Sequence, residues 1–170
     1  AAAAVEALAD GLGTQTRTAR DAFADGSYHD QPAHWIDRSA LVGRCNPIAP
    51  PMMFRFEDGR SHATFTLGHR HGGAPGIAHG GIVAAAFDQA MGHCATMHGV
   101  GGLTTTLTIR FKKPTPLCEP LRIEAWRTQQ VGPFATFEAA SYSADRCLGT
   151  ATGVFKVLDA AHAAHLFSGR

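Results

Sequence analysis

A single long helical segment lies among strand-like segments, and this arrangement limits what the chain can fold into. From residue 81 to about residue 97, apolar residues recur at the spacing of one buried helix face. Glycines at positions 99, 101 and 102 end the pattern. A helix with one apolar face must bury that face against another layer of structure. The residues on this face are Val83, Phe87, Ala90, Met91 and Cys94.

Strand-like segments flank the helix on both sides. Residues 52–57 and 61–67 are joined by the turn pair Asp58-Gly59, which is a strong hairpin signal. Four further segments follow the helix, at 103–112, 121–130, 134–144 and 147–158. About six strands and one long central helix predict an α+β fold, in which an antiparallel sheet wraps around that helix. Strict alternation along the first of the four segments would place five residues on one side: Leu103, Thr105, Leu107, Ile109 and Phe111.

The chain of 170 residues has the length of one domain with two flanking segments. Residues 52–158 carry the strands and the long helix and form the predicted domain. Residues 1–51 are an N-terminal extension, with an Ala-rich helical lead over residues 1–24 and a Gly- and Pro-containing loop after it. Residues 159–170 show no clear period and form a C-terminal tail.

Charge and composition favour a soluble cytoplasmic protein. Lys and Arg total 15 and Asp and Glu total 14, so the bulk positive field of a nucleic-acid-binding protein is absent. No apolar run reaches the roughly 18 residues of a membrane span. The first ten residues lack the basic stretch of a signal peptide, although the absence of an initiator Met leaves a removed targeting segment open. The four cysteines show no CxxC spacing and are expected to be reduced: Cys45, Cys94, Cys118 and Cys147.

Asp88 is the one functional side chain on its face of the predicted helix. At 3.6 residues per turn, its neighbours on that face are all Gly or Ala, namely Gly81, Ala84, Ala85, Gly92 and Ala95. A solvated helix face would carry Lys, Glu and Gln. A carboxylate on such a small-residue stripe suits a site that another backbone or a ligand approaches closely, although an Asp paired with a nearby Arg or amide is the competing interpretation.

Gly80 and Gly81 stand where the helix should begin. The first amides of a helix have no internal partner and carry partial positive charge, so a substrate carbonyl could bind there as in an oxyanion hole. A tight loop-to-helix turn would also explain these glycines. Asp88 lies seven residues beyond Gly81, roughly 10 Å along the axis. One carbonyl cannot reach both groups in one chain, so this chemistry predicts a site shared across a symmetric dimer.

The segment His79-Gly80-Gly81, with Asp88 nine residues after the His, resembles the PaaI-like hotdog-fold acyl-CoA thioesterases. Residues 103–118, LTTTLTIRFKKPTPLC, look like the strand that follows the central helix in that family. They look closest to the subgroup that contains the carboxyl-terminal modulator protein, a mitochondrial acyl-CoA thioesterase. The resemblance covers about residues 52–158 and implies the hotdog fold.

The resemblance also implies a reaction and a set of roles. The reaction is hydrolysis of a fatty or aromatic acyl-CoA thioester, with Asp88 as general base or nucleophile. The Gly81 amide matches the oxyanion donor, and His79 matches the motif histidine that shapes that end of the site. Thr104, ten residues before Pro114, matches a Ser or Thr that helps to hold the water. A capping role for His79 and an ordinary strand role for Thr104 stay open.

Contacts to the substrate follow from the same resemblance. CoA belongs to the substrate, no further cofactor or metal is expected, and the assembly is a homodimer or a dimer of dimers. For Lys112 and Lys113, the competing interpretation is that they are solvent-exposed charges on an edge strand and contact no substrate. One departure is the run at 72–75, where some relatives carry Asn or Gln. The expected contact residues are Gly80, Thr105, Arg110, Lys112, Lys113 and Phe87.

Other functions remain alternatives at this stage. A metal site would draw on a cluster within 30 residues that contains His69, His71, His79, His93, Cys94 and His98. A non-catalytic acyl-CoA-binding module, a hotdog hydratase or dehydratase and a scaffold protein could share the fold. The acyl-chain preference would depend on how six residues shape a tunnel: Met52, Met53, Phe54, Phe65, Phe87 and Phe134.

Overall fold

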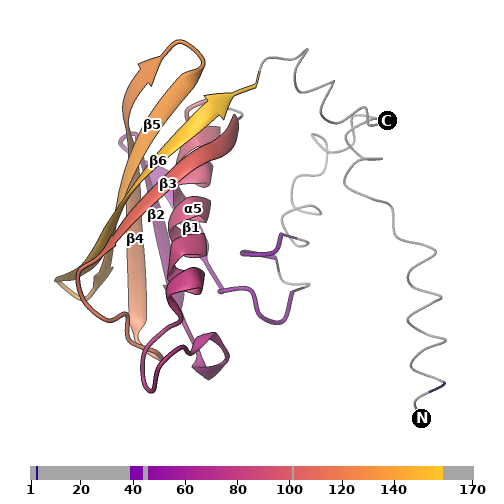
Figure 1. Ribbon diagram of the computed structural model, residues 1–170, viewed down its shortest axis with the longest axis vertical. Coiled ribbons are helices and arrows are strands. Elements are labelled where there is room, and N and C mark those ends of the chain that lie inside the picture. The colour runs from indigo at the N-terminus through magenta and orange to yellow at the C-terminus, as the bar shows by residue number, and fades with distance from the viewer. Residues whose placement is uncertain (1–2, 4–38, 44–45, 101, 159–170) are drawn as a thin grey trace.

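A six-stranded antiparallel sheet curves around one long helix (Figure 1). The computed structural model describes residues 3, 39–43, 46–100 and 102–158. The predicted helical lead and C-terminal tail lie outside these residues, apart from residue 3. The elements are β1 (Met53–Glu57), β2 (Arg60–Thr66), the 3-10 turn η1 (His69–His71), α5 (Gly80–Met97), β3 (Gly102–Phe111), β4 (Pro120–Val131), β5 (Phe134–Ser143) and β6 (Arg146–Val157). The predicted α+β fold with six strands is confirmed.

The strand order β1-β2-β4-β5-β6-β3 follows from three hairpins and two longer crossovers, from β2 to β3 and from β3 to β4. Asp58 and Gly59 both adopt positive φ, at 50° and 72°, as the two-residue turn between β1 and β2 requires. Helix α5 carries the chain from β2 to β3 across the concave face of the sheet. Among the described residues, β3 pairs only with β6, so its other edge is open.

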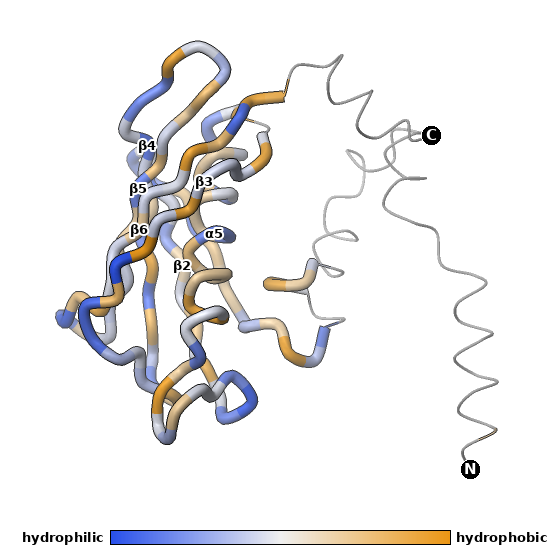
Figure 2. Tube along the Cα trace, in the orientation of Figure 1, coloured by the Kyte–Doolittle hydropathy of each residue, from blue (hydrophilic) through white to orange (hydrophobic). Residues whose placement is uncertain are grey.

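The apolar face of α5 packs into the concave side of the sheet. All five predicted positions are buried, together with Ala86 and Ala95. The seven buried residues of the helix are Val83, Ala86, Phe87, Ala90, Met91, Cys94 and Ala95. Figure 2 shows apolar and polar residues following one another along the strands, so each strand turns one side to this core. Gly153 on β6 makes room for the helix, because a Cβ there would stand 3.0 Å from the Met91 methyl carbon. No helix of the described residues has the length and hydropathy needed to cross a membrane.

A β-bulge in β3 overturns the predicted alternation of that strand. The register with β6 shifts between Thr104 and Thr106, so Thr105 is the extra residue. Thr104 therefore faces the helix together with Leu107 and Ile109, both of which pack against the core. A run of three threonines contains no signal for this bulge, which decides where the Thr104 hydroxyl points.

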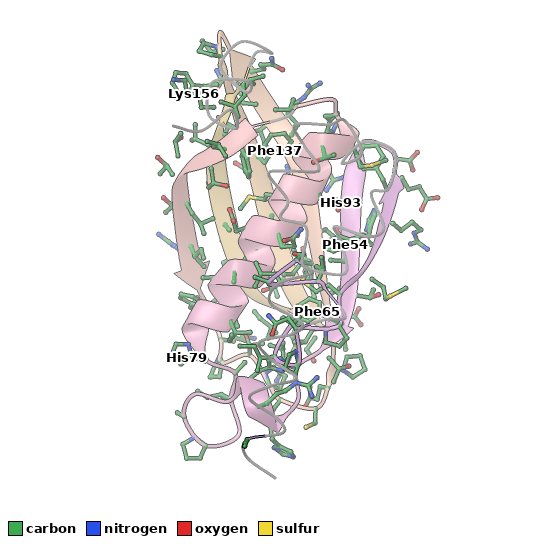
Figure 3. The ribbon with its side chains drawn as sticks, turned by 90° about the vertical axis from the view of Figure 1, so that its right-hand side faces the viewer. Phe54, Phe65, His79, His93, Phe137 and Lys156 are labelled. Carbon is green, nitrogen blue, oxygen red and sulfur yellow. The ribbon has the colours of Figure 1, made fainter. Side chains whose placement is uncertain are left out.

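Two histidines of α5 hold the β1–β2 hairpin against the helix. The Nδ1 atom of His93 lies 2.8 Å from the hydroxyl of fully buried Ser61, and its ring stacks on Phe54 with centroids 4.5 Å apart (Figure 3). The His98 Nε2 lies 3.0 Å from the Gly59 carbonyl oxygen. Burial lowers the pKa of His93 from its ordinary value. These side chains consequently serve the packing of the hairpin.

Acid should weaken the fold through His93. The folded pKa lies below the unfolded value of 6.5, so the unfolded chain binds this proton more readily. The stability gained from neutral His93 is complete above about pH 6.5 and is lost as the pH falls through the lowered folded pKa. Urea unfolding at neutral and mildly acidic pH should show a smaller acid-dependent loss in His93→Gln than in wild type. A His69→Gln control, at an exposed position, should keep the wild-type loss, and an equal loss in His93→Gln would contradict this assignment.

Candidate active site

The carboxylate of Asp88 is held by a hydroxyl from the neighbouring edge strand. The Thr104 Oγ1 donates a hydrogen bond of 2.8 Å to Asp88 Oδ1. No hydrogen-bond donor of the described residues reaches the second oxygen, Oδ2, and no described cation pairs with Asp88. The competing interpretation paired Asp88 with an Arg or an amide, whereas its partner among the described residues is the Thr104 hydroxyl. One carboxylate oxygen is fixed and the other is free to bind water or attack a substrate.

The stripe of small residues around Asp88 is open along most of its length. Gly81 is exposed, Ala84, Ala85 and Gly92 are half-buried like Asp88 itself, and only Ala95 is buried, at 2% exposure. A Cβ added at Gly92 would meet no atom within 4 Å. The backbone of α5 is thus accessible on both sides of Asp88, as a ligand or a second helix would require.

The N-terminus of α5 is capped by a histidine side chain. His79 is the N-cap residue, and its Nδ1 accepts a hydrogen bond of 3.0 Å from the Gly81 amide. The Gly81 amide is therefore occupied in this conformation. Gly80 is exposed, and no acceptor of the described residues bonds its amide. The free donor at this helix end is the amide of Gly80, one residue before the predicted one.

The loop before α5 is fixed from two sides. The buried side chain of His71 hydrogen-bonds through Nε2 to the Ile48 carbonyl oxygen, 3.0 Å away. The His71 carbonyl in turn accepts the His79 amide at 2.8 Å. A Cβ at Gly73 would stand 2.9 Å from the His79 Cα, so this close approach needs glycine. The glycine-containing run at 72–75, noted above as a departure, thus positions the cap of the helix.

A pocket of about 340 Å³ opens at this end of the helix. It brings together three of the predicted contacts, Gly80, Lys112 and Lys113, which come from the helix start and the end of β3. Two cationic side chains and a free amide in the lining suit a ligand that carries phosphate groups and a carbonyl. The full lining consists of Ile77, Ala78, Gly80, Val83, Phe111, Lys112, Lys113, Pro114 and Thr115.

The other predicted contacts lie away from this pocket. Phe87 is fully buried in the core. The Thr105 hydroxyl donates to the Val154 carbonyl oxygen at 3.0 Å and so braces the bulge. Arg110 is exposed on β3 but does not line the pocket. Substrate contact by these three residues stays a prediction.

The six apolar residues suggested for an acyl tunnel do not surround one cavity in the described part of the chain. Met53 and Phe65 line a separate groove of about 620 Å³ on β1, β2 and β4. Phe54 stacks on His93, and Phe134 lies 44% exposed at the start of β5. Their spacing in the sequence gave no information about which side of the sheet each would face.

The histidines proposed as an alternative metal cluster do not converge. Each of the five rings contacts a different partner: His69 contacts Cys118, His71 contacts Ile48, His79 contacts Gly81, His93 contacts Ser61 and His98 contacts Gly59. Within the described ranges, no three His, Cys, Asp or Glu side chains gather as a metal ion would need. Figure 3 shows His79 and His93 far apart along the helix.

One contributor to the site was missed by sequence reasoning. Phe111 lines the pocket beside Gly80, and an aromatic residue directly before two lysines was the available signal. The capping role of His79, kept open above, is observed, since its Nδ1 accepts the Gly81 amide.

The segment that carries these groups is similar to a known protein family. The family model described as the thioesterase superfamily matches residues 75–149, which include the helix N-terminus, Asp88, Thr104 and both lysines. Over this segment, which is less than half of the chain, the sequence is similar to the thioesterase superfamily. The resemblance to PaaI-like hotdog thioesterases is confirmed, as is the hotdog fold.

A curated relative and several solved structures resemble this chain. Acyl-coenzyme A thioesterase THEM4 of Bos taurus is 35% identical over 89 residues, which are 51% of this chain and 36% of that protein. The chain therefore spans about a third of the length of this relative. Among solved structures, a thioesterase superfamily protein has a TM-score of 0.66 at 24% identity, covering 89% of this chain and 91% of that chain.

Two further structures share the fold at lower identity. A hypothetical thioesterase of Streptococcus pneumoniae, solved with coenzyme A, has a TM-score of 0.60 at 22% identity, covering 62% of this chain and 87% of that chain. The E. coli PaaI protein has a TM-score of 0.60 at 15% identity, covering 64% and 80%. The Streptococcus pneumoniae protein was also solved as two variants, one with alanine replacing a Thr and one with alanine replacing an Asp.

Proposed function

We propose that this protein is an acyl-CoA thioesterase that hydrolyses the thioester of a fatty or aromatic acyl-CoA. The observation that carries the proposal is the carboxylate of Asp88, held by Thr104 on an open stripe of small residues. The same helix presents a free amide at its N-terminus, beside a pocket with two lysines. Carboxylate, oxyanion donor and cationic pocket are the three parts that hydrolysis of an acyl-CoA needs.

Asp88 acts on water or on the thioester itself. As a general base, its free oxygen takes a proton from water while the water oxygen bonds to the thioester carbon. The carbon–sulfur bond then breaks, the acid is released, and the CoA sulfur leaves with a proton returned by Asp88. As a nucleophile, the same oxygen would form a mixed anhydride that water hydrolyses. In both routes, the Thr104 hydroxyl fixes the orientation of the carboxylate through its hydrogen bond to Oδ1.

We assign the oxyanion donor to the Gly80 amide. The carbonyl oxygen of a thioester gains negative charge as the carbon is attacked, and a helix N-terminal N–H stabilises that charge. His79 occupies the Gly81 amide, whereas the Gly80 amide is unoccupied by the described residues and belongs to a residue that lines the pocket. His79 then has the structural task of fixing the first turn, so that the Gly80 amide keeps its direction.

The active site is assembled from two subunits. Asp88 lies eight residues beyond Gly80, roughly 12 Å along the helix axis, so one thioester cannot meet both in one chain. Strand β3 supports a two-fold contact because its ten residues have an open edge and little burial. Natural proteins cover or pair such an edge. A second copy beside β3 would bring its helix N-terminus toward Asp88 and create two equivalent sites.

The comparisons support this proposal through the chemistry that they name. The curated relative is an acyl-coenzyme A thioesterase, and its match of 89 residues covers about half of this chain. One structural neighbour was solved with coenzyme A. CoA enters here as part of the substrate, with no additional cofactor proposed. A non-catalytic binding module would have no use for a carboxylate held at the thioester, and no observation favours a hydratase.

Release of free CoA thiol tests the proposed function. The wild-type protein would be incubated with short, medium, long and aromatic acyl-CoAs, and the thiol would be followed with a chromogenic reagent. We expect turnover on at least one class, and the profile would reveal the acyl-chain preference. A folded protein that binds CoA by calorimetry but releases no thiol from any of these substrates would contradict the proposal and favour a binding module.

A further inference from the structure

Phe111 is an exposed aromatic side chain at the end of β3. It is 55% exposed, and it is the residue before the two lysines of the pocket. Exposed large apolar side chains are common on proteins when they stand alone. Phe111 does not stand alone, because it lines the 340 Å³ pocket together with Gly80 and Val83. A molecule bound in that pocket would therefore contact the Phe111 side chain.

The ring of Phe111 lies directly over the start of the helix. A Cβ placed on Gly80 would be 3.8 Å from the ring carbon Cζ, which is ordinary van der Waals contact. The backbone of Phe111 is paired with Gly149 at the last position of the β3–β6 ladder, which fixes where the side chain begins. The tip of the ring therefore lies beside Gly80, the residue that carries the proposed oxyanion donor, while its backbone leads directly into Lys112 and Lys113.

This placement puts Phe111 between the two polar ends of the pocket. In acyl-CoA, the pantetheine arm connects the phosphate groups to the thioester. If the phosphates lie at the lysines and the thioester carbonyl lies at Gly80, the arm must pass along the side chain that joins those two points. That side chain is Phe111, whose flat apolar face suits the methylene and amide groups of the arm.

We propose that Phe111 is a positioning residue that forms the wall for the pantetheine arm and aligns the thioester with the Gly80 amide. This inference rests on the proposed function and adds a specificity-determining residue to it. Because the contact is made in both the bound substrate and the transition state, losing it raises KM more than it lowers kcat.

A pair of substrates separates contact with the arm from contact with the nucleotide. S-acyl-pantetheine carries the same thioester and arm as acyl-CoA but lacks the phosphates and the adenosine. We expect Phe111→Ala to raise KM about tenfold on both substrates, as loss of the apolar contact that the arm makes with the ring implies. The double variant Lys112→Ala/Lys113→Ala should raise KM on acyl-CoA alone. Phe111→Leu should restore part of the loss.

Phe134→Ala is the matched control. Phe134 is also an exposed phenylalanine at a strand end, 44% exposed, but it is paired with Lys156 and does not line the pocket. The control should leave KM unchanged for both substrates. The molar mass of each variant in solution, measured by light scattering, should match wild type, since an interface role for Phe111 would change it.

Three results would overturn the inference. One is unchanged KM in Phe111→Ala on both substrates. Another is a rise in KM confined to acyl-CoA, which would place the ring against the adenine. The third is dissociation of the assembly in Phe111→Ala, which would make it an interface residue.

Calorimetric binding of pantetheine and of CoA keeps this inference separate from the proposed function. If wild type hydrolyses nothing but binds pantetheine, and Phe111→Ala weakens that binding about tenfold while Phe134→Ala does not, the proposed reaction fails and the assignment of Phe111 stands. If wild type turns over acyl-CoA with Phe111→Ala unaffected, the reaction stands and the assignment fails. Absence of pantetheine binding in an inactive wild type overturns both.

Discussion

Asp88→Asn should lower kcat for acyl-CoA hydrolysis by about 10²–10⁴-fold, the range typical of a lost general base. Asn has nearly the same size and shape as Asp, and its side-chain oxygen can still accept the hydrogen bond of 2.8 Å from the Thr104 hydroxyl. The packing around the helix stripe is therefore kept. What disappears is the ability to take a proton from water or to attack the thioester. Steady-state kinetics with the best acyl-CoA of the panel would measure the change.

Asp145→Asn provides the control for that substitution. Asp145 is an exposed carboxylate at the turn between β5 and β6, and it lines the separate groove. The same chemical change there should leave kcat within about twofold of wild type, since surface substitutions away from a site change little. Thermal unfolding and molar mass should match wild type in both variants. Turnover preserved in Asp88→Asn would remove this carboxylate from the mechanism.

Gly80→Pro should lower kcat by about 10²–10³-fold, because proline removes the amide hydrogen assigned to the oxyanion. The helix itself tolerates the change. Gly80 is the first helical residue, a position at which proline is favoured. The preceding His79 has φ −64° and ψ 129°, the extended conformation that a residue before proline adopts. The substitution is therefore aimed at one N–H rather than at the fold.

Gly80→Ala is the control for Gly80→Pro, because it adds a side-chain carbon atom and keeps the amide hydrogen. Alanine keeps the amide, and its Cβ would meet the Phe111 ring at 3.8 Å, an ordinary contact. We expect Gly80→Ala to retain most of the wild-type kcat, with helical circular dichroism equal in all three proteins. If Gly80→Pro stayed active, the donor would be the Gly81 amide, released from His79 on substrate binding. Equal losses in both variants would indicate steric obstruction instead.

The order and bounds of the main elements followed from local patterns. The helix period over residues 81–97, the Asp58-Gly59 turn and the four later strand segments all depend on neighbouring residues in the chain, and each was found within about a residue or two. The small-residue face of Asp88 was also visible, because residues three and four positions apart share a helix face.

Two features of the site, the bulge in β3 and the choice of free amide, could not be predicted from sequence patterns. The bulge at Thr105 arises from the register of β3 against β6, which a run of identical threonines does not specify. It gives Thr104 to the helix side and places its hydroxyl on Asp88. The choice between the Gly80 and Gly81 amides depends on a side-chain rotamer of His79. The pairing of two distant strands decides the first feature, and a local side-chain rotamer decides the second.

A mixed dimer tests the central claim, that one active site takes Asp88 from one subunit and the Gly80 amide from the other. One subunit would carry Asp88→Asn and the other Gly80→Pro, with different affinity tags for purification of the heterodimer. A shared site leaves one of the two sites with both native groups, so release of CoA should recover to about half of the wild-type kcat per dimer. If each subunit holds a complete site, both sites are damaged, and a heterodimer as inactive as its parents would contradict the account.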